Sequence, residues 1–165
     1  MEHIVGIGGY AVSNTPGDVI KTFALSTCVG VVFYSARRRA MGMAHVQLPD
    51  SRSAHGGSEP GRYADTAPRF LLQQLQTRFG LTKGELKISL YGGIDRMGDN
   101  DCFNIGEKNL AVLKAALRDI GLACSEADTG GFVSRTLAAY VGTGVVEVVR
   151  RPMAMGAEDA FKFHA

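Results

Sequence analysis

The sequence predicts an α/β fold with two main helices and strands that are mostly antiparallel. Short runs of β-branched and aromatic residues recur between turns rich in Gly and Pro, which is the pattern of strands. Two longer segments instead repeat leucine at helical spacing, and each ends at a glycine. With 165 residues, 45% of them hydrophobic, the chain can bury one core without disulfides. We expect a single domain over residues 1–151 and a C-terminal tail at 152–165.

The first strand is expected over residues 3–12. Three small residues in it match the GxGxxA variant of the dinucleotide-binding fingerprint: Gly6, Gly8 and Ala11. That motif needs a helix to begin at the same point, whereas Pro16 and Gly17 follow at once and indicate a turn. We therefore interpret the segment as a strand and not as a cofactor site. A brief extended segment, residues 18–22, leads into the next element.

A hairpin is expected next, with strands over residues 28–34 and 40–48. If its turn is centred between residues 36 and 37, Cys28 lies directly opposite His45. Opposed residues project to the same face with Cβ atoms roughly 5 Å apart, which brings a thiol within reach of an imidazole. A register shift of one residue would place the two side chains on opposite faces.

A polar loop and the first helix follow the hairpin. Residues 49–62 hold too many Gly and Pro for a regular element, and their position after His45 suggests one wall of a substrate cleft. Asp65 is the expected N-cap of the helix, and Gly80 its stop. The core-facing residues of this helix are Leu71, Leu72, Leu75 and Phe79.

A second helix and four more strands complete the predicted fold. Asn104 and Glu107 have the spacing of a capping box, and Gly121 stands where a left-handed C-terminal residue belongs. The apolar stripe of this helix is Leu110, Leu113, Leu117 and Ile120. The further strands are expected at residues 86–91, 122–127, 132–141 and 145–150, with the last two joined as a hairpin.

Charge and cysteine content exclude several classes of function. The net charge is only +2, and the one basic cluster, residues 37–39, has no interleaved aromatic residues, so no nucleic-acid partner is expected. No signal peptide or membrane-spanning run is present in the sequence, so we expect a cytoplasmic protein without membrane insertion. Cys28, Cys102 and Cys124 are odd in number and widely spaced, which indicates free thiols and no metal site. No cofactor is expected.

Two interpretations of Cys28 and His45 stay open at this level. A cysteine in an apolar strand is more often a small buried hydrophobe than a nucleophile, and a single strand histidine is more often structural. As an opposed pair, however, they have the chemistry of a nucleophile and its base. A neighbouring imidazolium can lower a thiol pKa from about 8.5 to below 7.

A series of short motifs runs in order along most of the chain. It comprises IVGIGGYAV, Thr22 six residues before Cys28, CVGVV, MAHVQLPDS, GRYADTA, YGG, FNIGEKN and DTGG. This series resembles the CheD family of chemoreceptor glutamine deamidases. Two positions depart from the family pattern. Ser26-Thr27 stands in place of Gly-Ser, which narrows the backbone conformations available beside the cysteine, and Ile94 stands in place of a small residue after Gly92-Gly93.

The resemblance implies a fold, a site and a reaction. The fold would be a layered α/β/β sandwich similar to the catalytic domain of cytotoxic necrotizing factor. Cys28, His45 and Thr22 would be the catalytic residues, with a cysteine thioester as the intermediate and the threonine orienting the imidazole. The implied substrates are glutamines of methyl-accepting chemotaxis receptors, which become glutamates with release of ammonia.

Two other functions stay open. Some members of the family dock a CheC-type phosphatase, so a non-enzymatic docking regulator is the alternative. A thiol protease or acyltransferase would use the same cysteine and histidine, and would differ by its product.

Overall fold

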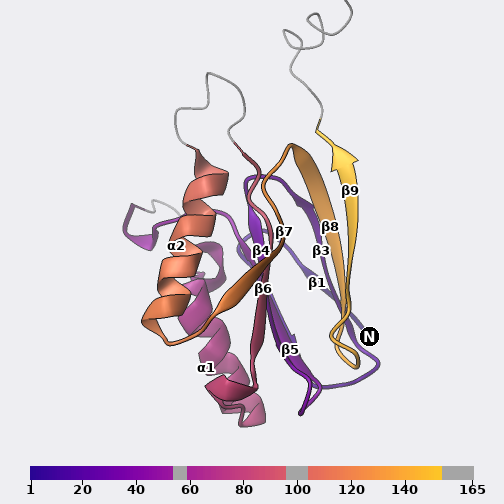
Figure 1. The fold of residues 1–165 in the computed structure, drawn as a ribbon. Helices are drawn as coiled ribbons and strands as arrows, with labels where there is room; N and C mark the ends of the chain where they lie inside the picture. The colour runs from indigo at the N-terminus through magenta and orange to yellow at the C-terminus, as the bar shows by residue number, and fades with distance from the viewer. Residues whose placement is uncertain (54–58, 96–103, 154–165) are drawn as a thin grey trace, which may run out of the picture.

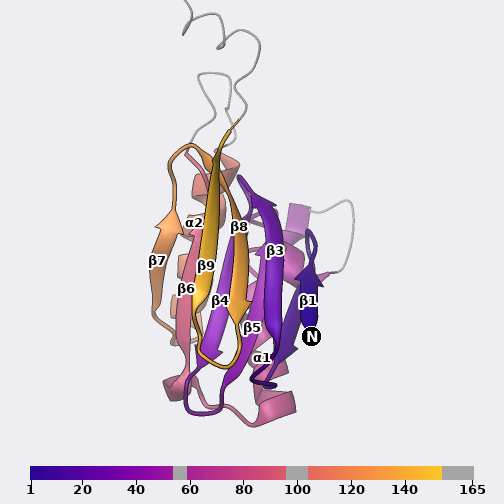
Figure 2. The same ribbon diagram turned by 90° about the vertical axis from the view of Figure 1, so that its right-hand side faces the viewer.

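The strands and helices form three layers (Figure 1). The computed structural model describes residues 1–53, 59–95 and 104–153. Within them, two α-helices cover one face of a five-stranded sheet, and a four-stranded sheet lies against its other face. Figure 2 looks onto the four-stranded sheet with the larger sheet behind it. The predicted layered α/β/β sandwich is confirmed, while its similarity to the catalytic domain of cytotoxic necrotizing factor stays a prediction.

The five-stranded sheet carries the central hairpin. Its order is β2-β5-β4-β6-β7, antiparallel except for the parallel pair of β6 and β7. In that order its strands are Tyr10–Ser13, Ala40–Val46, Val29–Ser35, Lys87–Gly92 and Cys124–Thr129. The four-stranded sheet has the order β1-β3-β8-β9, with β1 parallel to β3. Its strands are Glu2–Val5, Val19–Leu25, Val133–Tyr140 and Val146–Pro152.

The prediction of one strand over residues 3–12 is wrong. The segment forms two strands, β1 and β2, which belong to different sheets. A turn separates them, in which Gly9 donates its N–H to the Gly6 carbonyl and Gly8 has a φ of 77°. Glycine tolerates this left-handed conformation, so the chain can change sheets within four residues of β1.

The two helices have the predicted positions with different caps. Helix α1 spans Ala67–Phe79 and is followed by Gly80, whose φ of 65° confirms the predicted stop. Its N-cap is Thr66 and not Asp65, because the Asp65 carboxylate accepts hydrogen bonds from Ser51 instead. The remaining short turns are 3-10 helices at Ser51–Ser53, Pro60–Arg62 and Lys83–Glu85.

Helix α2 spans Ile105–Asp119 and starts after Asn104, as predicted. The Asn104 side chain makes no capping hydrogen bond, so the predicted capping box is wrong. Gly121 has a φ of 77°, as expected for the residue that ends this helix. Neither helix in the described part of the chain has the length and apolar character needed to cross a membrane.

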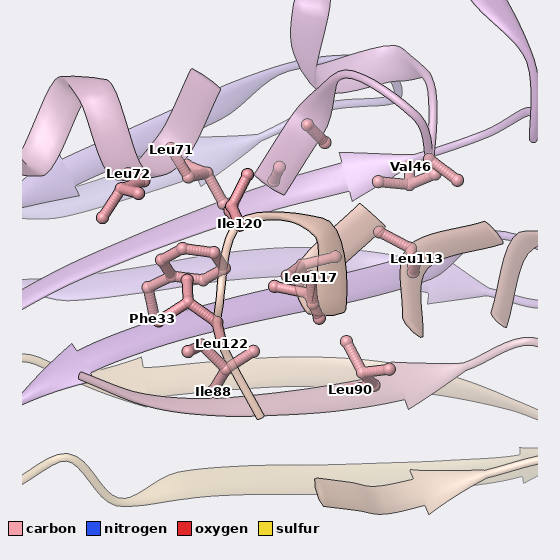
Figure 3. Close-up of a cluster of buried hydrophobic side chains, with 14 of the residues drawn as sticks. Phe33, Val46, Leu71, Leu72, Ile88, Leu90, Leu113, Leu117, Ile120 and Leu122 are labelled. Atoms are coloured by element: carbon pink, nitrogen blue, oxygen red, sulfur yellow. The ribbon is translucent and has the colours of Figure 1, made fainter. Parts of the chain in front are cut away.

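Alternation along β4 builds a core on each face of the larger sheet. Val31 and Phe33 face the helices and pack with their leucines, as Figure 3 shows for Phe33, Leu71 and Leu117. Val32 faces the other way and packs in the cluster between the two sheets. The first core joins the helices to the larger sheet, and the second core joins the two sheets.

The expected register of the hairpin is wrong by two residues. Strand β4 ends at Ser35, which pairs with Ala40, so four residues form the turn and Gly30 lies opposite His45. Cys28 precedes β4 and is two residues from the partner of His45. Because the shift is even, Cys28 and His45 keep the same face of the sheet.

Candidate functional site

The three predicted site residues lie between the two sheets. Thr22 is on β3 of the four-stranded sheet, and His45 is on β5 of the five-stranded sheet. Thr22 and His45 are 0% and 2% exposed, and Cys28 is 9% exposed in the cluster between the sheets. Cys28 precedes β4 and is a diagonal neighbour of His45, but no hydrogen bond joins its thiol to the imidazole, whose Nε2 has no partner among the described residues.

A glycine makes room for this arrangement. A Cβ on Gly30 would lie 2.9 Å from Leu137 Cδ1 and 3.1 Å from Leu25 Cδ1, both in the four-stranded sheet. The missing side chain therefore lets the two sheets approach closely beside His45. The same approach brings Thr22 to the imidazole.

A hydrogen-bond chain fixes the tautomer of His45. Thr22 Oγ1 lies 2.7 Å from the Val5 carbonyl oxygen and 2.8 Å from His45 Nδ1. A hydroxyl has one proton, and the carbonyl can only accept, so Thr22 donates to Val5 and accepts from Nδ1–H. His45 Nε2 then carries a lone pair, and this buried atom has no hydrogen-bond partner among the described residues.

Burial keeps both reactive groups neutral. It lowers the pKa of His45 to about 4 from 6.5, and raises the pKa of the Cys28 thiol to about 11 from 9.0. The Arg62 charge and the backbone N–H of Cys28 itself partly offset the effect of burial on the thiol. The resting pair is thus a thiol and an unprotonated imidazole, and not the ion pair that the sequence suggested.

The backbone beside Cys28 is held through its carbonyl groups. The carbonyls of Ser26 and Cys28 accept the N–H groups of Ile94 and Gly93, at 3.0 and 2.9 Å. The Thr27 carbonyl accepts the side-chain amide of Asn109 at 3.0 Å. The N–H groups of Thr27 and Cys28 make no hydrogen bond to another residue within the described part of the chain. Backbone N–H groups beside a nucleophile that have no partner in another residue can bind an oxyanion.

Arg62 is a charged residue near the site that sequence reasoning missed. Its guanidinium donates to the side chains of Gln47 and Glu59. It also covers the turn after β1, since a Cβ on Gly8 would lie 2.9 Å from its Cζ. The same turn binds the strand of His45, because Gly8 N–H donates to the His45 carbonyl. Arg62 lies in the motif GRYADTA, which was the available signal.

Other parts of the structure do not add to this set. In residues 1–53, 59–95 and 104–153, no three His, Cys, Asp or Glu side chains gather as a metal site would require. Cys124 is a free thiol on β7, and Cys102 lies outside the described residues. A cavity of about 370 Å³ is lined by Tyr34, Ser89 and Thr143 among others, and by none of the three site residues.

A thiol, an imidazole with a free nitrogen and an orienting hydroxyl are the groups that a cysteine-dependent hydrolase needs. Comparison with known proteins names the family. Residues 47–150 match the family described as "CheD chemotactic sensory transduction". The "Probable chemoreceptor glutamine deamidase CheD" of Syntrophotalea carbinolica is 40% identical over 149 residues, which are 88% of this chain and 91% of that relative. The chain belongs to the CheD family.

Another relative and a solved structure complete the comparison. The "Chemoreceptor glutamine deamidase CheD" of Thermotoga maritima is 38% identical over 146 residues, 87% of this chain and 88% of that relative. Among solved structures, the hypothetical protein YfiH of Bacillus licheniformis matches with a TM-score of 0.40 and 12% identity, covering 74% of this chain and 49% of that one. That similarity is too low to carry an argument about this chain.

Proposed function

We propose that this chain is a chemoreceptor glutamine deamidase with Cys28 as its nucleophile. It hydrolyses the side-chain amide of glutamines on chemotaxis receptors, which gives glutamate and ammonia. Membership of the CheD family and the names of its relatives support the reaction and the substrate. The hydrogen-bond chain from His45 through Thr22 to Val5 carries the assignment of the site, because it leaves Nε2 as a free base.

The first half of the reaction forms a thioester. His45 Nε2 takes the proton of the Cys28 thiol as the sulfur attacks the amide carbon of the glutamine. The carbonyl oxygen becomes an oxyanion, which the N–H groups of Thr27 and Cys28 can bind. The carbon–nitrogen bond then breaks, and the proton on Nε2 passes to the nitrogen, which leaves as ammonia.

The second half restores the thiol. His45 Nε2 takes a proton from a water molecule, whose oxygen attacks the thioester carbon. The carbon–sulfur bond breaks, the sulfur regains the proton from Nε2, and the side chain is released as glutamate. During both halves the imidazolium keeps its Nδ1–H donated to Thr22, so the ring does not rotate.

Because the Cys28 thiol and the His45 imidazole are neutral at rest, negative charge develops on the sulfur during the reaction. Because burial favours the thiol and the neutral imidazole, the sulfur becomes anionic only as it attacks. The Arg62 guanidinium favours the anionic form of Cys28 and so acts in the same direction as the backbone N–H groups. Positive charge and oriented dipoles that are already in place lower the barrier most, because they need not reorganise.

The proposal is tested with a chemoreceptor cytoplasmic fragment from the same cell. The fragment is incubated with the native chain or with Cys28→Ala, and peptide mass mapping and released ammonia are followed. We expect glutamine-to-glutamate conversion at specific positions of an uncut receptor, with the native chain only. Conversion by Cys28→Ala at the native rate, or no conversion on any receptor of that cell, would refute the proposal.

A further inference from the structure

We propose that Asn109 is a positioning residue that aims the backbone N–H of Cys28 at the oxyanion, an inference that rests on the proposed function. Asn109 lies on α2 and is completely buried. Its side-chain amide donates to the Thr27 carbonyl and to the Gln47 carbonyl, each at 3.0 Å. The residue therefore contacts no reacting atom and acts through the backbone.

Peptide geometry converts the first contact into an orientation. The Thr27 carbonyl and the Cys28 N–H belong to one peptide group, and the described chain has no cis peptide bond. In a trans peptide the two groups point in opposite directions. Because Asn109 binds the carbonyl from the α2 side, the N–H of Cys28 points away from α2 and towards its own sulfur. The favourable effect of this N–H on the Cys28 thiolate agrees with that direction.

Of the carbonyls of Ser26, Thr27 and Cys28, the Thr27 carbonyl is the one bound by a side chain. The neighbouring carbonyls of Ser26 and Cys28 are held by the main chain of Ile94 and Gly93, whatever their side chains are. The Thr27 carbonyl depends on the Asn109 amide. The orientation of the Cys28 N–H is therefore open to change by a single substitution.

The hydrogen bond to Gln47 connects the Asn109 side chain to β5, the strand that carries His45. Gln47 follows the end of β5, two residues beyond His45. One NH₂ group thus spans the segment before β4 and the end of β5, and both of its protons are used. The positions of the nucleophile and the base are set relative to each other through this group.

The unpaired oxygen of Asn109 argues against a role in stability alone. Asn109 Oδ1 is buried and has no hydrogen-bond partner among the described residues. Its neighbours on the same helical face are Leu110 and Leu113, which pack in the core without such a cost. An apolar residue of the same shape would avoid the unpaired oxygen but would leave the carbonyls of Thr27 and Gln47 without this donor, so the donor group is what distinguishes asparagine here.

The test compares two reactions of Cys28 that differ in their need for an oxyanion site. With p-nitrophenyl acetate, the sulfur forms a bond to the acyl carbon through a tetrahedral oxyanion, and p-nitrophenolate leaves. With iodoacetamide, the sulfur displaces iodide directly and no oxyanion forms. The ratio of acylation to alkylation rates therefore reports the oxyanion site, and Cys28→Ala gives the background from Cys102 and Cys124.

Asn109→Leu keeps the shape of the side chain and removes both donors, and Asn109→Ala removes them with a smaller residue. We expect the acylation rate to fall about tenfold or more in each, with the alkylation rate within about twofold of native, as for a misaligned oxyanion donor. Leu113→Ala, one turn along the same helix, is the control for lost packing and should leave the ratio unchanged.

An unchanged ratio in both Asn109 variants, or an equal fall in the Leu113→Ala control, would overturn the inference. Failure of both Asn109 variants to fold, seen by thermal unfolding, would make the residue a determinant of folding and would also overturn it. The test needs no receptor. If the native chain deamidates no receptor while the ratio falls as expected, the proposed function fails and the inference about Asn109 stands.

Discussion

Replacing Thr22 by valine should separate the tautomer of His45 from the packing between the sheets. Valine has nearly the shape of threonine and removes only the hydroxyl, which makes bonds of 2.7 Å to Val5 and 2.8 Å to His45 Nδ1. Each buried group left without a partner costs about 1–3 kcal/mol of folding free energy. The loss would be about 2–6 kcal/mol if neither group adjusted.

The imidazole has a way to adjust, and that adjustment removes its function. Moving the ring proton from Nδ1 to Nε2 removes the N–H that faces the valine, but Nε2 is itself buried without a partner among the described residues, so the stability loss should stay within the same range. Nε2 would then be protonated and unable to accept the Cys28 proton. We expect kcat to fall about 100-fold or more with little change in KM, since a triad histidine held in the wrong tautomer can lose about 10⁴-fold.

The assay is deamidation of a receptor fragment, with Thr22→Ser as the matched control because it keeps the hydroxyl. Imidazole nitrogen chemical shifts of His45, measured by NMR, report the tautomer in each variant. The serine variant should keep the lone pair on Nε2 and most of the activity. A valine variant that is as active as the serine variant, or that keeps Nε2 unprotonated, would refute this reasoning.

Two further predictions concern the thiol and the packing of α2. The alkylation rate of Cys28 should rise with pH towards about 11, since burial raises its pKa to about 11 and leaves only about one hundredth of it as thiolate at pH 9. A plateau near pH 7 would instead show a thiolate paired with an imidazolium at His45. Gly106→Ala should lower the unfolding free energy by about 1–3 kcal/mol and slow deamidation, despite the higher helix propensity of alanine. Its Cβ would lie 2.2 Å from the carbonyl oxygen of Ile94. The N–H of the same residue donates to the Ser26 carbonyl, in the segment before Cys28. Urea unfolding measures the free energy of each variant, with Gly84→Ala as the control because a Cβ there meets no atom within 4 Å. An unfolding free energy of Gly106→Ala equal to that of the control and of the native chain would contradict this prediction.

The periodicity of the sequence predicted most helices and strands, but not which strands pair in the same sheet. The leucine stripes predicted both helices, and the alternating strands after residue 85 were found within about two residues, as expected for element ends. The split between β1 and β2 was missed because a run of apolar residues around glycines is continuous in sequence. The chain changes sheets at the turn that contains Gly8, whose left-handed backbone conformation the neighbouring residues do not predict.

The register of the hairpin was also not predicted by the sequence pattern. The turn was expected to be centred between residues 36 and 37, whereas residues 36–39 form it and Arg39 adopts a left-handed φ of 45°. Arginine carries no signal for that conformation, in contrast to Gly or Asn. The pairing of Cys28 with His45 was therefore displaced, and only the even size of the shift kept both on one face.

Contacts across the sheets could not be predicted from spacing. Thr22 was singled out through the resemblance to the CheD family, and its contact with His45 joins strands of different sheets. Asn109 was missed, although it is the last residue of the motif FNIGEKN, because the core face of α2 was interpreted through its leucines. The available signal was a polar residue next to Leu110 and one turn before Leu113, on the face that enters the core.

The most direct test of the central claim is turnover of a receptor fragment in the presence of hydroxylamine, followed by peptide mass mapping. A thioester on Cys28 would be divided between water and hydroxylamine, because both attack the same acyl carbon. The account predicts glutamyl hydroxamate at the same positions that otherwise become glutamate, with the loss of glutamine no faster than in water alone. Glutamate as the sole product at every hydroxylamine concentration would contradict it, since water would then attack the amide directly.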